Sequence, residues 1–241
     1  MQHIFRKEVA SYFDSLIAYV VLGIFFLSIG LFFWVFEYNI LEPGNTFATL
    51  DGLFVYGPYL FLFLIPALTM GSFSEEVSRG TLEFLLTKPL TEWQIIGGKY
   101  LATVFLIFFS LALTLVYYFT VSWLGNPVGN LDQGATWGGY LGLFFVGCIF
   151  SAIGIWSSSL TDSQIVAFIL AAFLCFFLYQ GLEYLAGIRA LNTLNALIIH
   201  IGLMEHYQQI SQGVLDLRNV VYFLSTIAIF LLLTRWSLER R

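Results

Sequence analysis

The sequence has few charged residues. Only 10% of its 241 residues are Asp, Glu, Lys or Arg, whereas an ordinary soluble domain has about 25%. Its two cysteines, Cys148 and Cys175, both lie within apolar runs, where a cysteine behaves as a small hydrophobic residue. The composition therefore excludes an ordinary soluble domain and a disulfide framework, and it favours an integral membrane protein.

The chain also lacks the motifs that nucleotide binding and common hydrolytic reactions require. A P-loop ending at Gly98 and Lys99 would need Gly at position 93 and Ser or Thr at position 100, but the chain has Trp93 and Tyr100 there. There is no H-E-x-x-H, C-x-x-C or G-x-S-x-G pattern, and the histidines do not cluster at ligand spacing. The few basic residues lie beside apolar runs, which argues against nucleic-acid binding. We therefore expect no enzyme activity, no catalytic residues, and no metal or cofactor on this chain.

Long apolar runs are present instead. A membrane-spanning helix needs about 20 mostly apolar residues, and helices satisfy their own backbone polar groups in lipid. We predict an all-α polytopic membrane protein, a single transmembrane domain over residues 1–241, embedded in a lipid bilayer. Its six predicted spans are residues 16–36, 53–71, 99–124, 138–160, 164–185 and 217–236.

Small residues recur at four-residue spacing in the fourth run, for example Gly138 with Gly142 and Gly154 with Ser158. Such spacing lets helix backbones approach closely in lipid. The pattern fits packing within one subunit, and it equally fits a contact between two subunits.

Basic residues near the ends of the runs indicate the orientation of the chain, because cytoplasmic loops carry an excess of Lys and Arg. With six spans, most of the basic residues fall on one side, together with both termini. We therefore predict that both termini and the connection 72–98 are cytoplasmic. The residues concerned are Arg6, Lys7, Arg79, Lys88, Lys99, Arg235, Arg240 and Arg241.

Two segments do not fit a simple up-and-down arrangement. Residues 1–15 place apolar side chains at helical spacing among charged ones, which is typical of a helix lying at the membrane surface. Residues 186–216 contain an apolar stretch that is too short and too interrupted to span. We predict an N-terminal interfacial helix and a re-entrant or outer helical segment before the last span.

The connection 72–98 is the longest polar stretch predicted on the cytoplasmic side. Glu75, Glu76 and Arg79 are expected to form a charged surface patch, and Gly80 allows a turn. Residues 81–86 could form a short apolar-faced helix.

The same connection contains signals for where its helices stop and start. Pro89 would stop the helix before it, and Thr91 could cap a second short helix. Gly97 and Gly98 are then expected to release the chain into the third span. By residue chemistry alone, the whole connection could equally be a solvated loop.

The stretch EEVSRGTLEFLLTKPLTEWQIIGGKYL resembles the connection between the second and third spans of ABC-2 type transporter permeases. The resemblance extends over the whole chain, including the N-terminal helix and the broken outer segment. In that family, this connection carries a coupling helix that docks on a separate ATP-binding subunit. The resemblance implies that the ATPase-coupling positions are Glu75, Glu76, Arg79, Gly80, Thr81, Glu83, Leu85 and Pro89.

Within this family, the sequence is most similar to the gliding-motility-associated permease subunits of the GldF type. The similarity implies a bacterial cytoplasmic (inner) membrane protein that couples ATP hydrolysis to substrate export or to work on the envelope. It also implies three partners: an ABC ATPase subunit of the GldA type, which would carry the ATP, a membrane protein of the GldG type, and a second permease copy or a paralogue.

One ionisable residue lies within a predicted span. Glu183 is close to Gln180 in the fifth run, and a charge in a span is by default a functional candidate. These two residues could line a translocation pathway, although Glu183 is near enough to the outer end to reach water. An autonomous channel or secondary carrier would need such groups near the middle of the membrane, and this is the alternative function.

Overall fold

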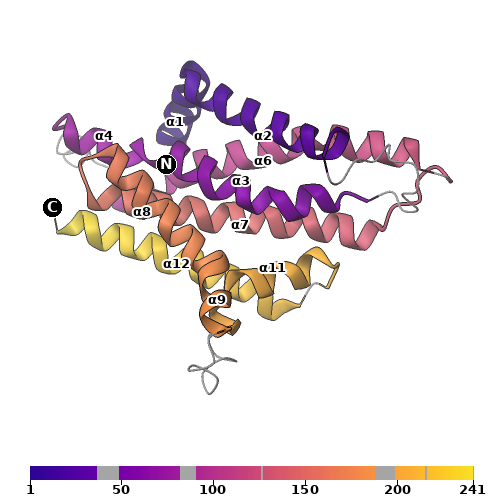
Figure 1. Ribbon diagram of the computed structural model, residues 1–241. Helices are drawn as coiled ribbons and strands as arrows, with labels where there is room; N and C mark the ends of the chain where they lie inside the picture. Colours follow the sequence, from indigo (N-terminus) through magenta and orange to yellow (C-terminus); the bar gives the residue numbers. More distant parts are fainter. Residues whose placement is uncertain (37–48, 82–90, 126, 188–198, 215, 241) are drawn as a thin grey trace.

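The computed structural model describes residues 1–36, 49–81, 91–125, 127–187, 199–214 and 216–240. These residues form helices, and no strand occurs among them, which confirms the predicted all-α class. Figure 1 shows the long helices side by side, with both chain ends toward the same end of the bundle. We call this the terminal end of the molecule.

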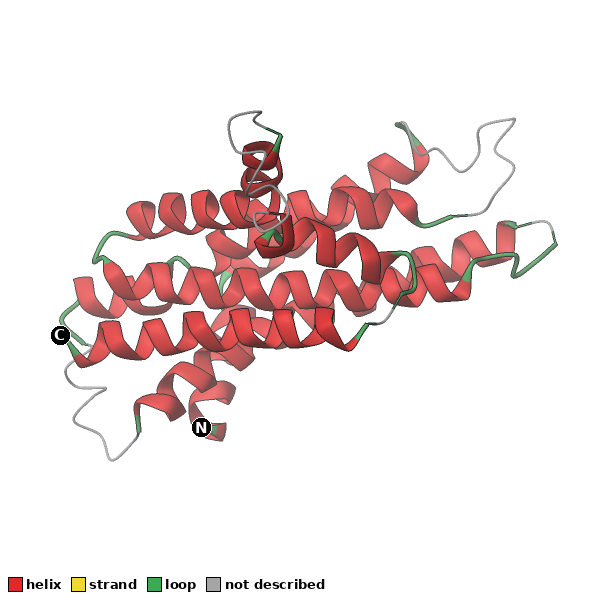
Figure 2. Cartoon of the chain, turned by 90° about the horizontal axis from the view of Figure 1, so that it is seen from below, coloured by secondary structure: helices red, strands yellow, loops and turns green. Residues whose placement is uncertain are grey.

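Within the described part of the chain, six helical segments are long and apolar enough to cross a membrane, which confirms the predicted fold, and Figure 2 shows the chain from below. The second segment is α3 continued by α4, and the fifth is α8 continued by a π-helix, η1, and by α9. Their bounds are α2 (Leu16–Trp34), α3 (Asp51–Thr69), α4 (Gly71–Ser78), α6 (Glu92–Leu124), α7 (Gln133–Leu160), α8 (Gln164–Phe176), η1 (Phe177–Gly181), α9 (Leu182–Ala186) and α12 (Leu217–Glu239).

Helix α6 begins at Glu92, earlier than its apolar run predicts. A capping box at Thr91 and Gln94 starts the helix, and the Thr91 N–H donates to Gln94 Oε1 at 3.3 Å. Gly97 and Gly98 lie inside the helix. The predicted break at this Gly-Gly pair is therefore wrong: packing against neighbouring helices keeps α6 continuous where local propensity would favour an interruption.

Helix α7 is the central element of the bundle. In its most apolar window 83% of the residues are buried, against 17% for α12 and 22% for α2. A Cβ atom at Gly142 would lie 3.1 Å from the ring of Tyr207, and one at Gly154 would lie 2.8 Å from Thr69 Cβ. The small residues of α7 therefore let α3 and α11 approach closely within this subunit, which favours the first of the two packing alternatives.

Two further helices do not span. Helix α1 (Gln2–Asp14) packs against α6, as a separate helix in the predicted N-terminal segment. Helix α11 (Leu203–Ser211) lies in the predicted outer segment and buries Tyr207 and Ile210, with the Tyr207 hydroxyl donating to the Phe54 carbonyl. The rest of that segment, residues 188–198, lies outside the described residues.

Candidate functional site

The Arg-Gly-Thr sequence after α4 forms the stop signal of that helix. Gly80 has φ +65°, a left-handed conformation that glycine adopts without steric cost. Its N–H donates to the Val77 carbonyl at 3.0 Å, and the Thr81 N–H donates to the Glu76 carbonyl at 2.9 Å. These two bonds constitute a Schellman motif, so Gly80 and Thr81 set the direction in which the chain leaves α4.

The beginning of α4 is held by a serine on α7. The Ser158 hydroxyl accepts from the N–H groups of Phe73 at 2.9 Å and Ser74 at 3.0 Å, and it donates to the Met70 carbonyl at 2.8 Å. The first N–H groups of a helix have no partner within the helix, and Ser158 supplies one from outside. All three contacts are buried or nearly so, so α4 is tied to the central helix of the bundle.

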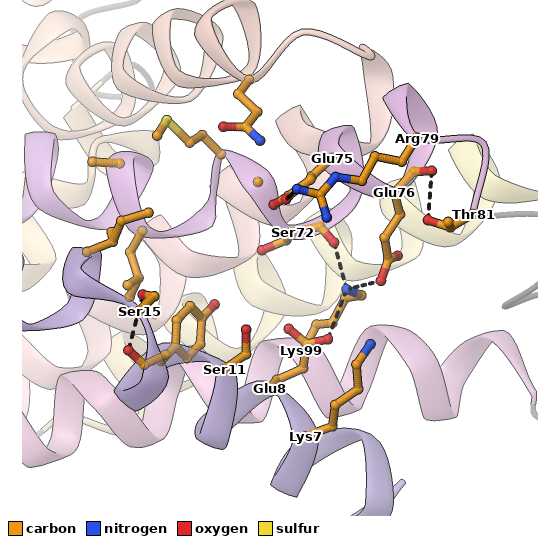
Figure 3. Close-up of a pocket in the computed structure, with 17 residues that line it drawn as sticks. Lys7, Glu8, Ser11, Ser15, Ser72, Glu75, Glu76, Arg79, Thr81 and Lys99 are labelled. Carbon is orange, nitrogen blue, oxygen red and sulfur yellow. Dashed lines mark hydrogen bonds and ion pairs between the residues drawn. The ribbon is translucent and has the colours of Figure 1, made fainter.

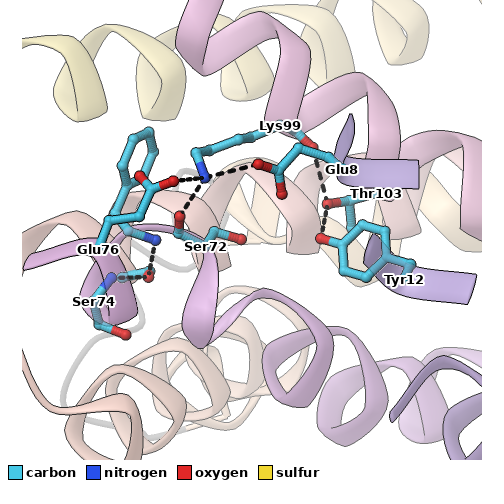
Figure 4. A network of polar contacts seen from close by, with 9 residues as sticks. Glu8, Tyr12, Ser72, Ser74, Glu76, Lys99 and Thr103 are labelled. Atoms are coloured by element: carbon cyan, nitrogen blue, oxygen red, sulfur yellow. Dashed lines mark hydrogen bonds and ion pairs between the residues drawn. The ribbon is translucent and has the colours of Figure 1, made fainter. Parts of the chain in front are cut away.

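A buried ion cluster joins α1, α4 and α6 (Figure 4). Lys99 Nζ lies 2.9 Å from Glu76 Oε1 and 3.2 Å from Glu8 Oε1, and it donates to the Ser72 carbonyl at 2.7 Å. The Lys99 side chain is only 4% exposed. Burying an ammonium group is costly unless opposite charges and hydrogen bonds compensate for lost water. Here the carboxylates of Glu8 and Glu76 and the carbonyl of Ser72 compensate. Glu8 belongs to α1, and Ser72 and Glu76 lie one turn apart on α4.

The residues that surround this cluster pack α1 closely onto α6. A Cβ atom at Gly98 would lie 2.7 Å from Ile4 Cγ2, so the glycine leaves room for the α1 side chain. The hydroxyl oxygens of Tyr12 and Thr103 lie 3.2 Å apart. Burial raises the pKa of the Tyr12 phenol above its ordinary value, which keeps this group neutral. Helix α1 is therefore part of the packed structure at the terminal end.

A second ion cluster joins the end of α12 to the start of α6. Arg235 Nε donates to Glu92 Oε2 at 3.0 Å, and Arg235 Nη2 lies 2.7 Å from Glu239 Oε1. The guanidinium also lies 5.7 Å from the centre of the Trp93 ring. Helix α4, which precedes residues 82–90, is therefore anchored to α6 and α7. Helix α6, which follows these residues, is anchored to α12.

A cavity of about 620 Å³ opens between α1 and the junction of α3 with α4 (Figure 3). Glu75 and Arg79 lie at its edge and form an ion pair at 2.6 Å on the exposed surface. Glu76 and Lys99 lie deeper in the cavity wall. The structure thus brings Glu75, Glu76, Arg79 and Thr81 to one cavity.

The sequence predicts Glu76 in an exposed charged patch, but the structure turns its side chain into the interior. Its side chain is 18% exposed and is directed to Lys99, whereas Glu75 and Arg79 are at the surface with 40% and 71% exposed side chains. The difference arises because α4 turns the Glu76 face toward α6. The remaining predicted coupling positions, Glu83, Leu85 and Pro89, lie outside the described residues.

Glu8 is the functional candidate that the sequence did not reveal. It lies on α1, 91 residues away from Lys99 along the chain, and nothing in its local sequence separates it from other surface glutamates. The available signal was Lys99 itself, because a lysine inside a spanning helix requires a partner.

The candidate pathway residues lie elsewhere in the bundle. Gln180 is in the π-helix η1 and accepts a hydrogen bond from the Tyr59 hydroxyl at 2.6 Å. Glu183 is exposed and lines a separate cavity of about 160 Å³ together with Glu205. Gln180 therefore contacts α3, while Glu183 lies at a small cavity beside α11.

No curated protein matches the chain. The sequence profile of the ABC-2 family transporter protein matches residues 3–241, which is almost the whole chain and includes every element described above. The chain is therefore a multi-pass membrane protein that belongs to the ABC-2 transporter family.

Proposed function

We propose that this chain is the non-catalytic permease subunit of an ABC transporter and that a separate ABC ATPase docks at its terminal end. Family membership and the anchoring of α4 support this role. Helix α4 directly precedes residues 82–90, and Ser158 and Lys99 connect it to α7 and α6. A displacement of the segment around residues 75–91 by an ATPase would therefore reach the spanning helices through rigid contacts.

The finer assignments rest on the sequence resemblance. We assign the terminal end to the cytoplasm and the chain to the bacterial inner membrane, with a second permease copy or a paralogue completing the transporter. The gliding-motility subtype gives a GldA-like ATPase and a GldG-like membrane protein as partners. ATP hydrolysis on the partner then drives export of a substrate or mechanical work on the envelope.

The single observation that carries the proposal concerns the two faces of α4. Glu75 and the following Arg79 are exposed, whereas the opposite face is held to α6 and α7 by Glu76 and Ser74. Arg79 is 71% exposed, so it is available to a partner. Lys99 and Glu76 are not available, because they contact each other in the interior.

A co-purification experiment tests the docking surface. The tagged chain is expressed with the ABC ATPase encoded beside it, and recovery of the ATPase and its hydrolysis rate are measured. Arg79→Glu and Leu85→Asp should reduce both quantities. Arg218→Glu, an equal charge reversal at the exposed start of α12, is the matched control and should not.

Two outcomes would overturn the proposal. If the wild-type chain recovers no ATPase while it folds and inserts normally, the permease assignment fails, and an autonomous carrier centred on Gln180 and Glu183 becomes the better explanation. If Arg79→Glu and Arg218→Glu reduce recovery equally, docking does not occur at α4.

A further inference from the structure

The cavity at the terminal end is lined by both charged and apolar residues. Figure 3 shows Lys7, Arg79 and Glu76 toward one side of it, which we call its polar end, and Ser15 toward the other. The lining also includes the apolar residues Ile17, Ala67, Leu68 and Met70 and one amide, Gln164. Its volume, about 620 Å³, lies within the range of cavities that bind small organic molecules. A molecule that fills this space must therefore be amphipathic.

The charges at the polar end are unevenly distributed. The buried cluster holds two carboxylates, Glu8 and Glu76, around the single ammonium of Lys99, so it carries one excess negative charge. An additional cation in the adjoining cavity would offset this excess negative charge.

The rim of the same cavity carries the opposite excess. Arg79 is balanced by Glu75 at 2.6 Å, but Lys7 has no ion-pair partner among the described residues. The hydroxyl of Ser11 also lines the cavity, one turn from Lys7 along α1. An ammonium and a hydroxyl at this spacing suit a phosphate group, which accepts several charge-assisted hydrogen bonds.

We propose that this cavity binds the headgroup of phosphatidylethanolamine from the adjoining leaflet of the membrane. The phosphate lies near Lys7 and Ser11, and the primary ammonium donates to the exposed carboxylate of Glu75. The acyl chains leave past Ile17, which is half exposed. A choline headgroup has no N–H to donate, and a glycerol headgroup has no positive charge, so both should bind less well.

The bound lipid would fill the space between α1 and α4 and contact both helices. The inference is independent of the ATPase partner, since it concerns only the cavity of this chain. It assigns to the lipid a structural contact with the same helix that is proposed to receive the ATPase.

Lipid-dependent thermal stability tests the proposal. The full chain is purified in detergent, stripped of lipid and mixed with phosphatidylethanolamine, phosphatidylcholine, phosphatidylglycerol or soluble phosphoethanolamine, with bound lipid identified by native mass spectrometry. At about 100 times its Kd, phosphatidylethanolamine should raise the melting temperature by about 5 °C or more. The other three should raise it by less than half as much.

Matched variants locate the effect. Lys7→Gln, Glu75→Gln and Ser11→Phe should each remove most of the shift, the first two by loss of charge and the third by filling the space. Arg6→Gln, next to Lys7 but outside the cavity, and Glu239→Gln, which breaks a similar i,i+4 ion pair on α12, should keep it.

Three results would overturn the proposal. Equal stabilisation by phosphatidylglycerol would show that no ammonium group is recognised. Equal stabilisation by soluble phosphoethanolamine would assign the site to a soluble ligand instead of a membrane lipid. An undiminished shift in Ser11→Phe would place the lipid elsewhere on the protein.

Discussion

Three consecutive serines at the end of α7 provide a sharp test of how α4 is anchored. Ser157, Ser158 and Ser159 are all fully buried, yet their hydroxyls have different partners. The Ser158 hydroxyl makes three hydrogen bonds to the backbone around the start of α4. The Ser159 hydroxyl donates only to the Trp156 carbonyl of its own helix, at 2.7 Å. The Ser157 hydroxyl has no partner among the described residues.

The magnitudes follow from these contacts. Ser158→Ala leaves the buried Phe73 N–H without an acceptor, at about 1–3 kcal/mol, and removes a second acceptor from the Ser74 N–H and a donor from the Met70 carbonyl, so we expect a loss of about 3 kcal/mol in the free energy of unfolding. Ser159→Ala should cost about 0.5 kcal/mol, because the Trp156 carbonyl that loses this hydrogen bond remains within the hydrogen-bonded backbone of α7. Ser157→Ala should be neutral or slightly stabilising, since it removes an unpaired buried hydroxyl.

Thermal unfolding in detergent, followed by circular dichroism, measures the three differences. With about 2–4 °C for each kcal/mol in a chain of this size, Ser158→Ala should lower the melting temperature by about 6–12 °C, and the other two should change it by less than about 2 °C. Equal shifts in all three variants would refute the reasoning, because they would show that loss of a hydroxyl at this depth matters regardless of its partners.

Three further predictions concern the contact between α1 and α6. Gly98→Ala should lower the melting temperature because its Cβ would meet Ile4 at 2.7 Å, whereas Gly97→Ala, with only ordinary contacts, should raise it by improving helix propensity; a gain in both variants would contradict the close packing. Lys99→Met should cost about 3–5 kcal/mol by leaving two carboxylates unpaired, and equal stability of this variant in denaturant titration would show that the cluster is solvated. Because the folded protein raises the pKa of Tyr12, that residue favours folding at pH values below its ordinary pKa of about 10, and its contribution is lost as the pH rises beyond it. The free energy of unfolding of Tyr12→Phe should therefore fall less steeply with pH than that of the wild type above about pH 10. Identical dependence on pH in the two proteins would rule this out.

Much of the fold could be predicted from the sequence, because the relevant signals are local. The length of each apolar run is a property of consecutive residues, and it gave the number of spans. The helix stop at Gly80 is equally local, since only the backbone of a few residues forms the Schellman motif. The ordered motif from Glu75 to Pro89 likewise pointed to the family, although it gave no information on which side chains face inward.

The start of α6 was predicted less well, for a physical reason. Local propensity favours an interruption at Gly97 and Gly98, but the packing of α1 against Gly98 supplies stabilisation that propensity does not include. A glycine pair thus serves as a contact surface in the folded protein, and the sequence alone could not distinguish this role from a break.

The sequence by itself therefore determined the helical class, the six spans and the family of this protein. Only the tertiary structure decided that Glu8 and Glu76 share Lys99, that Ser158 holds the start of α4, and that the small residues of α7 face inward. The first group of properties depends on hydrophobicity summed along the chain, which neighbouring residues set together. The second group depends on which faces of distant helices meet, and that is decided by packing and by the pairing of buried polar groups over the whole bundle.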